Sequence, residues 1–194
     1  MDKPALRASI RERRRSRSPA DRTQAAQAIA TRAVVFLPDE PGDITCYASL
    51  PGEPGTAPLI AVLLERDHRV WLPRITGDRL VWVRVDEATI YRAGPLGIME
   101  PPGLGVDAMD FADVALLPAL AVDSTGRRLG QGGGFFDRAL AAIAPPEAGG
   151  PLLVALVHDD EVIDLIPTEE HDRPVDAVVT PTRTLRTGGT NLFG

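Results

Sequence analysis

The sequence lacks the features of a disulfide-bonded, membrane-spanning or secreted protein. Its 194 residues include one cysteine, Cys46, so no intrachain disulfide can form and a reducing compartment is expected. The longest apolar stretch, Val114 to Val122, is interrupted by Pro118 and is far short of the roughly 20 residues of a membrane helix. No apolar segment follows the arginines of residues 13–17, as a secretion signal would require. These absences predict a cytoplasmic protein.

Histidine is also scarce, and its placement argues against a zinc site. The three histidines, His68, His158 and His171, do not have metal-ligand spacing with Cys46. Hydrophobic residues make up 44% and charged residues 25% of the chain, which are ordinary values for a globular protein. At roughly 100–200 residues per domain, residues 1–194 are expected to form one domain that needs no structural metal.

The net charge of −6 conceals an uneven distribution. The basic N-terminal segment, residues 1–22, holds one lysine and seven arginines against three acids, which leaves 13 bases and 24 acids in residues 23–194. A basic segment on an acidic body indicates that the segment binds an anion. A solvated, arginine-rich helix face explains the same charges, and charge alone leaves these two interpretations open.

Hydrophobic spacing and capping residues predict helices over residues 3–17, 18–37 and 56–68. The second helix begins with Ser18 as its N-cap, Pro19 at its first position and Asp21 three residues past the cap, and Thr56 is expected to cap the third. Apolar, β-prone runs predict strands over residues 44–50, 69–75, 79–85, 151–159 and 175–181, and residues 113–123 are predicted to form a buried strand, residues 113–117, that runs into a loop. Residues 87–111 are predicted to form a functional or disordered loop, and residues 182–194 a loose tail.

Continuous apolar strands that alternate with helices indicate a sheet whose two faces are both covered. The sequence therefore predicts an α/β fold, a single three-layer domain with a mainly parallel, doubly wound sheet flanked by helices. In such a fold, ligands bind outside the carboxyl ends of the strands, where a strand turns into a helix.

The glycine run, residues 130–134, has four glycines in five positions and directly precedes a predicted helix over residues 135–144. Its glycines are Gly130, Gly132, Gly133 and Gly134. Glycines allow successive backbone N–H groups to converge on one anion, and a helix N-terminus adds partial positive charge. The run is neither a P-loop, because no Lys-Ser or Lys-Thr follows it, nor a dinucleotide fingerprint. It favours phosphate binding over a purely structural turn.

A carboxylate follows the glycine run at Asp137. This position suits a Mg²⁺ ligand, because Mg²⁺ takes one or two carboxylates together with phosphate oxygens. The alternative role of Asp137 is to stabilise the N-terminus of the helix through the helix dipole. Arg127, Arg128 and Arg138 flank the run and can neutralise phosphate charge.

Five segments, in order along nearly the whole chain, carry a resemblance to a known family. They are KPALR (residues 3–7), YASLPGEPGT (47–56), LGIMEP (96–101), GRRLGQGGGFFDR (126–138) and PTEEHDRPVDAVVTP (167–181). They are similar to motifs of the 5-formyltetrahydrofolate cyclo-ligases (methenyltetrahydrofolate synthetases), whose glycine-rich loop reads roughly G-x-R-L-G-x-G-x-G-Y-Y-D-R. Each match alone is weak, and the five in register are specific.

The resemblance implies an ATP- and Mg²⁺-dependent cyclisation of 5-formyltetrahydrofolate to 5,10-methenyltetrahydrofolate, with release of ADP and phosphate. A formamide oxygen is a poor leaving group, and transfer of the γ-phosphoryl group to it makes an imidate phosphate that the substrate's own N10 can attack. Phosphoryl transfer needs positioning and charge neutralisation from the protein. No enzyme nucleophile is therefore expected, and Arg128 and Arg138 are expected to position and neutralise the phosphates.

The resemblance also implies the site residues. ATP is expected to bind Lys3, Pro4, Ala5, Leu6 and Arg7 together with Arg128, Leu129, Gly130, Gln131, Gly132, Gly133, Gly134, Phe135 and Phe136. The folate is expected to contact Ala48, Glu53, Gln131, Gly132, Gly133, Gly134 and Phe135. The two magnesium carboxylates are expected to be Asp137 and Asp176. Glu100, Glu170, His171 and Asp172 lie in or beside the matched motifs without a role.

Glu53 has a chemical reason to contact the folate, because a carboxylate can accept two hydrogen bonds from the amino and ring N–H edge of a pterin. One departure from the family concerns Phe135 and Phe136, which stand where the family usually has two tyrosines. Stacking on a ring survives this change, and a hydroxyl hydrogen bond does not. Arg13, Arg14 and Arg15 are expected to be surface residues only.

Two alternatives to the cyclo-ligase interpretation remain open at this point. One is a paralogue that keeps the ATP site and uses another substrate. The other is a nucleic-acid-binding module led by the basic N-terminal segment, which the acidic body and the absence of interleaved aromatic and basic residues disfavour. The expected partners are therefore ATP and 5-formyltetrahydrofolate, with no nucleic acid and no membrane, and the protein is expected to be a monomer.

Overall fold

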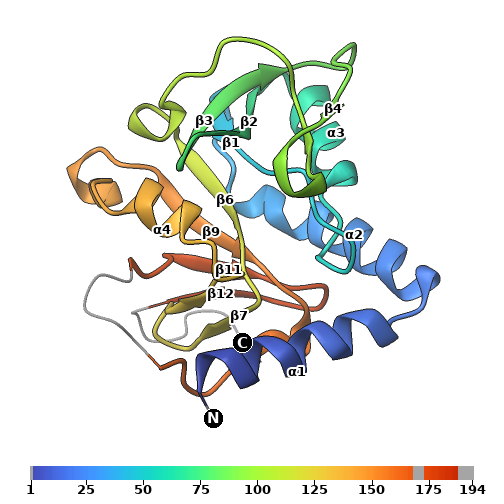
Figure 1. Cartoon of the computed structure of the whole chain (residues 1–194). Helices are drawn as coiled ribbons and strands as arrows, with labels where there is room; N and C mark the ends of the chain where they lie inside the picture. The colour runs from blue at the N-terminus through green and yellow to red at the C-terminus, as the bar shows by residue number, and fades with distance from the viewer. Residues whose placement is uncertain (1, 168–172, 188–194) are drawn as a thin grey trace.

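The computed structural model describes residues 2–167 and 173–187 of the chain. Its centre is a seven-stranded sheet in the order β12-β11-β9-β6-β1-β2-β3 (Figure 1). The strands are β1 (Asp43–Thr45), β2 (Arg69–Thr76), β3 (Arg79–Val85), β6 (Val114–Pro118), β9 (Leu152–Leu156), β11 (Ala177–Val179) and β12 (Thr184–Arg186). The strands from β11 through β9, β6 and β1 to β2 run parallel, and only the edge strands β3 and β12 pair antiparallel. The predicted mainly parallel sheet is confirmed.

Helices cover both faces of this sheet. The helices α2 (Pro19–Ala33) and α3 (Ala57–Glu65) lie on one face, where Ile29 and Leu59 pack in one cluster with Leu116 of β6. The short helix α4 (Phe135–Leu140) lies on the other face, where Leu140 packs in one cluster with Leu117 of β6. Because successive side chains of a strand point to opposite faces, a strand covered on both sides must be apolar throughout. The three-layer α/β prediction is confirmed.

The first helix, α1 (Lys3–Ser16), packs on a second, smaller sheet rather than on the central one. This sheet has the order β10-β7-β8, with β7 (Ala121–Asp123), β8 (Arg128–Leu129) and β10 (Val162–Ile163). Ile10 of α1 is fully buried and packs in one cluster with Leu120 and Leu129. The strand predicted over residues 113–117 is β6, which ends at Pro118, and the loop predicted to follow it as far as Asp123 contains β7, which joins the smaller sheet.

Two further sequence predictions need correction. The expected loose tail begins with an edge strand, because β12 pairs with β11 and Thr187 N donates to Asp176 O at 3.1 Å. Residues 87–111 hold the hairpin of β4 (Arg92–Ala93) and β5 (Met99–Glu100) and two short 3₁₀ turns, η2 (Pro95–Gly97) and η3 (Ala108–Asp110). The remaining 3₁₀ turns are η1 (Val34–Phe36), η4 (Pro146–Ala148) and η5 (Asp159–Glu161).

The order of the strands fixes where a ligand can bind. From β1 the chain proceeds outward to β2 and β3, and from β6 it proceeds outward in the opposite direction to β9 and β11. The sheet order thus reverses between the neighbouring strands β1 and β6, and in open α/β sheets ligands bind beyond the carboxyl ends of the strands at such a point.

Within the described residues, no helix has the length and apolar character needed to cross a bilayer.

Candidate functional site

A cavity of about 300 Å³ lies beyond the carboxyl ends of β1 and β6. Tyr47 and Ala48, which follow β1, and Pro118, which ends β6, contribute to its wall. The predicted site residues that line it are Ala48, Glu53, Arg128, Gly130, Gln131, Gly132, Gly133, Gly134, Phe135, Phe136 and Asp137. The glycine run and its flanking side chains therefore meet the YASLPGEPGT segment at one cavity, although some eighty residues separate them in the sequence.

The glycine run needs its glycines for backbone conformation and for space. Gly132 and Gly134 have φ angles of +103° and +68°, in the left-handed region that favours glycine. A Cβ atom added to Gly134 would lie 2.7 Å from Nη1 of Arg138, so a side chain there would also displace Arg138. The helix α4 begins at Phe135, directly after the run, as predicted.

The helix α1 docks on the glycine run through two arginines. Arg7 Nε donates to Gly130 O at 3.0 Å, and Arg11 Nη2 donates to Gln131 O at 2.8 Å. Lys3 lies one helical turn before Arg7, at the start of α1, where Asp2 accepts a capping hydrogen bond from Ala5 N at 2.9 Å. The two predicted ATP-binding segments are therefore adjacent.

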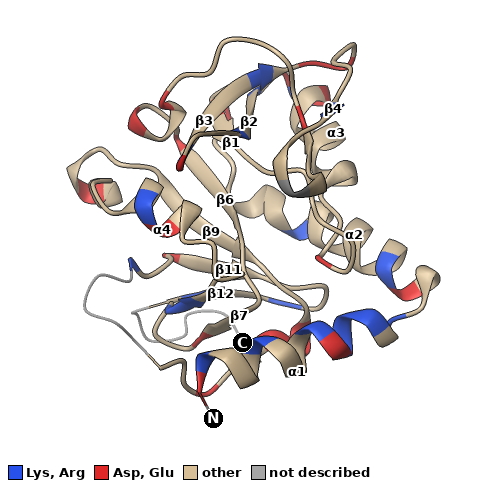
Figure 2. Ribbon diagram, in the orientation of Figure 1, with Lys and Arg blue, Asp and Glu red and all other residues tan. Residues whose placement is uncertain are grey.

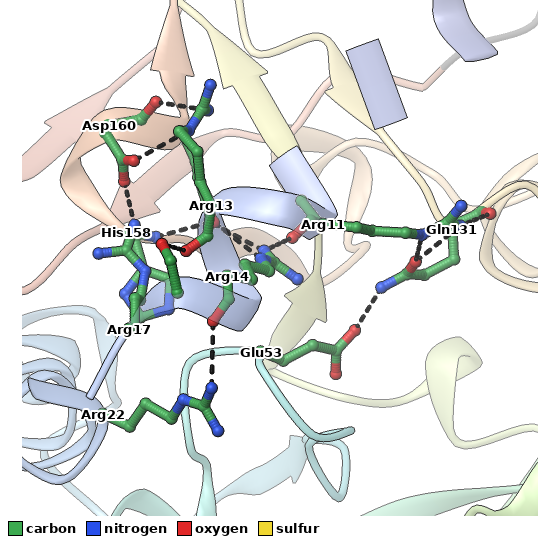
Figure 3. A network of polar contacts seen from close by, with 12 residues as sticks. Arg11, Arg13, Arg14, Arg17, Arg22, Glu53, Gln131, His158 and Asp160 are labelled. Carbon is green, nitrogen blue, oxygen red and sulfur yellow. Dashed lines mark hydrogen bonds and ion pairs between the residues drawn. The ribbon is translucent and has the colours of Figure 1, made fainter. Parts of the chain in front are cut away.

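Glu53 is 7% exposed, and both of its carboxylate oxygens accept hydrogen bonds (Figure 3). Leu50 N donates to Oε2 at 2.8 Å, and Gln131 Nε2 donates to Oε1 at 2.9 Å. The Gln131 amide oxygen accepts a hydrogen bond from Arg11 at 3.1 Å, so the amide nitrogen is the end that faces Glu53. Burial raises the pKa of Glu53 above the usual glutamate value. A ligand that bonds to Oε1 of Glu53 would therefore share this oxygen with Gln131 or replace it.

Tyr47 is a site residue for which the sequence predicts no role, although it lies in the YASLPGEPGT segment. Its side chain is 3% exposed and lines the cavity, and its hydroxyl has no hydrogen-bond partner among the described residues. Burial raises the pKa of Tyr47 well above the usual tyrosine value, so the hydroxyl stays a neutral donor. Its main-chain oxygen accepts from Thr56 Oγ1 at 2.5 Å. Thr56 is the N-cap residue of α3, as predicted, but its hydroxyl is used here and makes no capping hydrogen bond.

Asp137 and the arginines form the charged end of the cavity. Asp137 pairs with Arg128, whose side chain is 4% exposed, while the Asp137 side chain is 48% exposed. The guanidinium of Arg128 lies 6.0 Å from the ring centre of Phe136, and that of Arg138 lies 5.0 Å from the ring centre of Phe135. Asp137 therefore has a third role besides the two considered from the sequence, which is to neutralise a buried arginine.

The structure does not bring Asp176 to this cavity. Asp176 precedes β11 at the amino end of the parallel strands, and its Oδ2 accepts from Leu153 N at 2.8 Å. The cavity lies at the opposite, carboxyl end of the sheet, and its lining includes Asp137 and not Asp176. In the part of the chain that the structure describes, no group of three or more histidine, cysteine or acidic side chains is arranged to hold a metal. The pairing of Asp137 and Asp176 as magnesium ligands stays a prediction.

Arg14 is buried, contrary to the prediction that it is a surface residue. It is 3% exposed, and its guanidinium donates to both carboxylate oxygens of Glu161, at 2.7 and 2.8 Å, and to Ala119 O at 2.6 Å. Arg13 and Arg15 have side chains that are 41% and 71% exposed, as predicted. The signal was present in the sequence, because Arg14 follows the buried Ile10 by four residues and so continues the buried side of the helix.

The residues without a predicted role divide into two groups. Glu100 is 6% exposed, lines the cavity and accepts a hydrogen bond from Ile75 N at 2.9 Å, so it supports the cavity wall. Glu170, His171 and Asp172 lie outside the described residues.

A larger groove of about 670 Å³ meets the cavity at Ala48. Acidic residues line this groove, and neither the glycine run nor any arginine or lysine of the described residues does. The smaller cavity is therefore the candidate site.

Comparisons with known proteins show which proteins this chain resembles in sequence and fold. A family model described as the 5-formyltetrahydrofolate cyclo-ligase family matches residues 1–181. A 5-formyltetrahydrofolate cyclo-ligase from Mycolicibacterium smegmatis is 37% identical over 93% of this chain and 94% of its own length. One from Escherichia coli is 32% identical over 90% of this chain and 97% of its own length. The solution structure of a 5,10-methenyltetrahydrofolate synthetase from Aquifex aeolicus, 26% identical, superimposes with a TM-score of 0.79 over 100% of this chain and 97% of that one.

Proposed function

The chain belongs to the 5-formyltetrahydrofolate cyclo-ligase family, and from this we propose that it cyclises 5-formyltetrahydrofolate to 5,10-methenyltetrahydrofolate at the expense of ATP and with Mg²⁺, releasing ADP and phosphate. One observation of the structure carries the proposal. The glycine run and the buried carboxylate of Glu53 line one cavity at the reversal point of the sheet, and Arg7 of α1 donates a hydrogen bond to the main chain of that run. These are the groups that a phosphoryl donor and a pterin acceptor require.

The proposed reaction proceeds in two steps. The formyl oxygen of the folate attacks the γ-phosphorus of ATP, the bond to the β,γ-bridging oxygen breaks, and ADP leaves. The N10 amine then attacks the formyl carbon, the carbon–oxygen bond breaks, N10 loses its proton, and phosphate departs with the former formyl oxygen. Both steps need close positioning and neutralisation of charge, and neither needs a covalent bond to the enzyme.

We assign the phosphates of ATP to the glycine run and to Lys3 and Arg7. Arg7 already donates to Gly130 O, which supports its placement beside the phosphates. Asp137 fits a single magnesium carboxylate, because its side chain is half-exposed at the cavity wall and Mg²⁺ completes its coordination with phosphate oxygens and water. Mg²⁺ bound there would neutralise charge that develops on the transferred phosphoryl group.

We assign the pterin to Glu53, Ala48 and the ring of Phe135. The ionised carboxylate of Glu53 accepts two hydrogen bonds from the amino and ring N–H edge of the pterin, in place of the hydrogen bond from Gln131. Tyr47 adds a neutral hydroxyl donor at the same wall. The absent hydroxyls at Phe135 and Phe136 remove two polar contacts and leave stacking in place.

The test is a mixture of the protein, ATP, Mg²⁺ and 5-formyltetrahydrofolate in which the absorbance of methenyltetrahydrofolate is followed. We expect product only when all three are present and loss of turnover when EDTA removes the metal. A protein that binds ATP but forms no product with this folate would be a paralogue with another substrate. A salt-sensitive gel shift with nucleic acid would favour the alternative of a nucleic-acid-binding module.

We further propose that the enzyme works as a cytoplasmic monomer.

A further inference from the structure

A basic groove of about 490 Å³ lies beside the cavity, and no role has been assigned to it above. Arg11, Arg14, Arg15 and Arg22 line this basic groove, and its lining among the described residues contains no acid. The four arginines come from α1 and the start of α2 (Figure 2). In a chain of net charge −6, this is a local concentration of positive charge.

The four arginines are not equally neutralised. Arg14 is paired with the buried Glu161, and Arg15 is paired with the exposed Glu12 at 2.5 Å. Among the described residues, Arg11 donates only to Gln131, and Arg22 Nη2 donates to the main-chain oxygens of Arg14 and Arg15 at 3.3 and 3.1 Å. Neither Arg11 nor Arg22 forms an ion pair with a carboxylate of the described residues, and the buried Arg22 Nε has no hydrogen-bond partner there. Two positive charges of the groove are therefore available to an anion.

The basic groove is continuous with the candidate active site. Leu50 and Gln131 line both the groove and the cavity, so the two spaces are adjacent at these residues. Figure 3 shows Gln131 between Arg11 on one side and Glu53 on the other, held by hydrogen bonds to both. A ligand that displaces Gln131 from Glu53 would open the cavity toward the groove.

The spacing of cations along α1 points to the kind of anion. Lys3, Arg7, Arg11 and Arg15 recur at every fourth residue, which places them in a row that winds gradually around the helix at steps of about 6 Å. Two of them, Arg7 and Arg11, already point at consecutive residues of the glycine run. A row of cations that leads from the glycine run into the groove matches a linear anion with several charges.

We propose that the basic groove is a polyphosphate subsite, in which Arg11, Arg15 and Arg22 share the binding of the nucleotide's phosphate groups with Lys3, Arg7 and the glycine run. This inference rests on the proposed ATP-dependent function and extends its nucleotide site. The carboxylates of a folate glutamate tail share the same chemistry. The phosphate source is favoured because Gln131, which belongs to the glycine run assigned to the phosphates, lines the groove, whereas Glu53, assigned to the pterin edge, lines only the cavity.

The test measures binding without turnover, by calorimetric titration of the protein with ATP and with inorganic tripolyphosphate. Arg22→Gln is expected to raise the Kd of both ligands about tenfold, since it removes one charge-assisted contact. Arg15→Gln is expected to act in the same direction, and Arg22→Lys to retain much of the affinity because the charge stays. Arg66→Gln, at an exposed arginine outside the groove, is the matched control and should bind as the unaltered protein does. Thermal unfolding of each variant verifies its fold.

Two results would overturn the proposal. The first is an unchanged Kd for ATP and for tripolyphosphate in both Arg22→Gln and Arg15→Gln. The second is weaker binding of an oligo-γ-glutamyl folate in these variants with unchanged tripolyphosphate binding, which would assign the groove to the folate tail. Failure to form methenyltetrahydrofolate would contradict the proposed function instead, because these titrations do not depend on turnover.

Discussion

At the scale of single residues, Asp137 has three candidate partners: a magnesium ion, the helix dipole and Arg128. Asp137→Asn keeps the shape of the side chain and removes its charge. The dipole and the half-exposed ion pair together account for about 1 kcal/mol of unfolding free energy. We expect Asp137→Asn to stay within about that margin in urea unfolding while turnover collapses and the Mg²⁺ requirement rises. Unaltered turnover at unaltered Mg²⁺ concentration would show that Asp137 is not a magnesium ligand.

A substitution of Asp176 distinguishes a magnesium site with two carboxylates, Asp137 and Asp176, from a site with Asp137 alone. Its Oδ2 accepts the Leu153 N–H, so Asp176→Asn weakens a part-buried hydrogen bond and is expected to lower the unfolding free energy by roughly 1–3 kcal/mol. The geometry of the described residues predicts that the Mg²⁺ dependence of turnover stays the same, because Asp176 lies away from the cavity. A Mg²⁺ titration that shifts as far in Asp176→Asn as in Asp137→Asn would instead make Asp176 the second ligand.

Glu53 sets an expected pH dependence. Burial raises its pKa, so in the free enzyme the carboxyl stays protonated to a higher pH than an exposed glutamate does. Because the ionised form accepts the two pterin hydrogen bonds, folate affinity should increase as pH rises through this elevated pKa and fall on the acid side. Because the pKa of Glu53 is higher in the folded than in the unfolded protein, its contribution to folding stability is present below the unfolded-state pKa. This contribution is lost as the pH rises through the folded-state pKa. Glu53→Gln should bind folate weakly and lose the acid limb in a plot of log(1/Kd) against pH, and an acid limb retained in this variant would assign it to another group.

At the scale of elements, the attachment of α1 depends on one buried ion pair. Arg14→Met leaves Glu161, which is fully buried, without its charge partner, and loss of one member of a buried pair costs about 3–5 kcal/mol. Because α1 carries Lys3 and Arg7, we expect this variant to lose ATP affinity as well as stability in urea unfolding. Arg13→Met is the control, since the exposed pair of Arg13 with Asp160 contributes at most about 1 kcal/mol. Equal stabilities of the two variants would contradict the anchoring role of Arg14.

Elements that are specified locally could be predicted from the sequence, and elements that depend on distant pairing could not. The start of α2 is local, because Ser18 and Asp21 form the predicted capping box within four residues. Strands β7 and β12 have three residues each and exist because of their partners, with Val122 of β7 opposite Val162. No periodicity is readable in three residues, so the second sheet and the edge strand were missed.

The candidate site shows the same division. The glycine run and Asp137 could be recognised from their spacing alone, since a turn and a helix start are local features. The hydrogen bond from Arg7 to Gly130 joins residues 123 positions apart, and only the resemblance to a family connected those segments beforehand. Arg14 was misjudged because its charge suggested solvent, whereas its partner, Glu161, lies far along the chain.

At the scale of the whole molecule, the reversal of strand order, the docking of α1 on the glycine run and the position of Glu53 define the cavity at which we propose that the two substrates react. The central claim is that ATP phosphorylates the formyl oxygen there and that this oxygen leaves with the phosphate. The most direct measurement uses 5-formyltetrahydrofolate labelled with ¹⁸O at the formyl group and analyses the inorganic phosphate by mass spectrometry. The account predicts one ¹⁸O atom in the phosphate for each methenyltetrahydrofolate formed. Unlabelled phosphate, with the ¹⁸O in water, would contradict it.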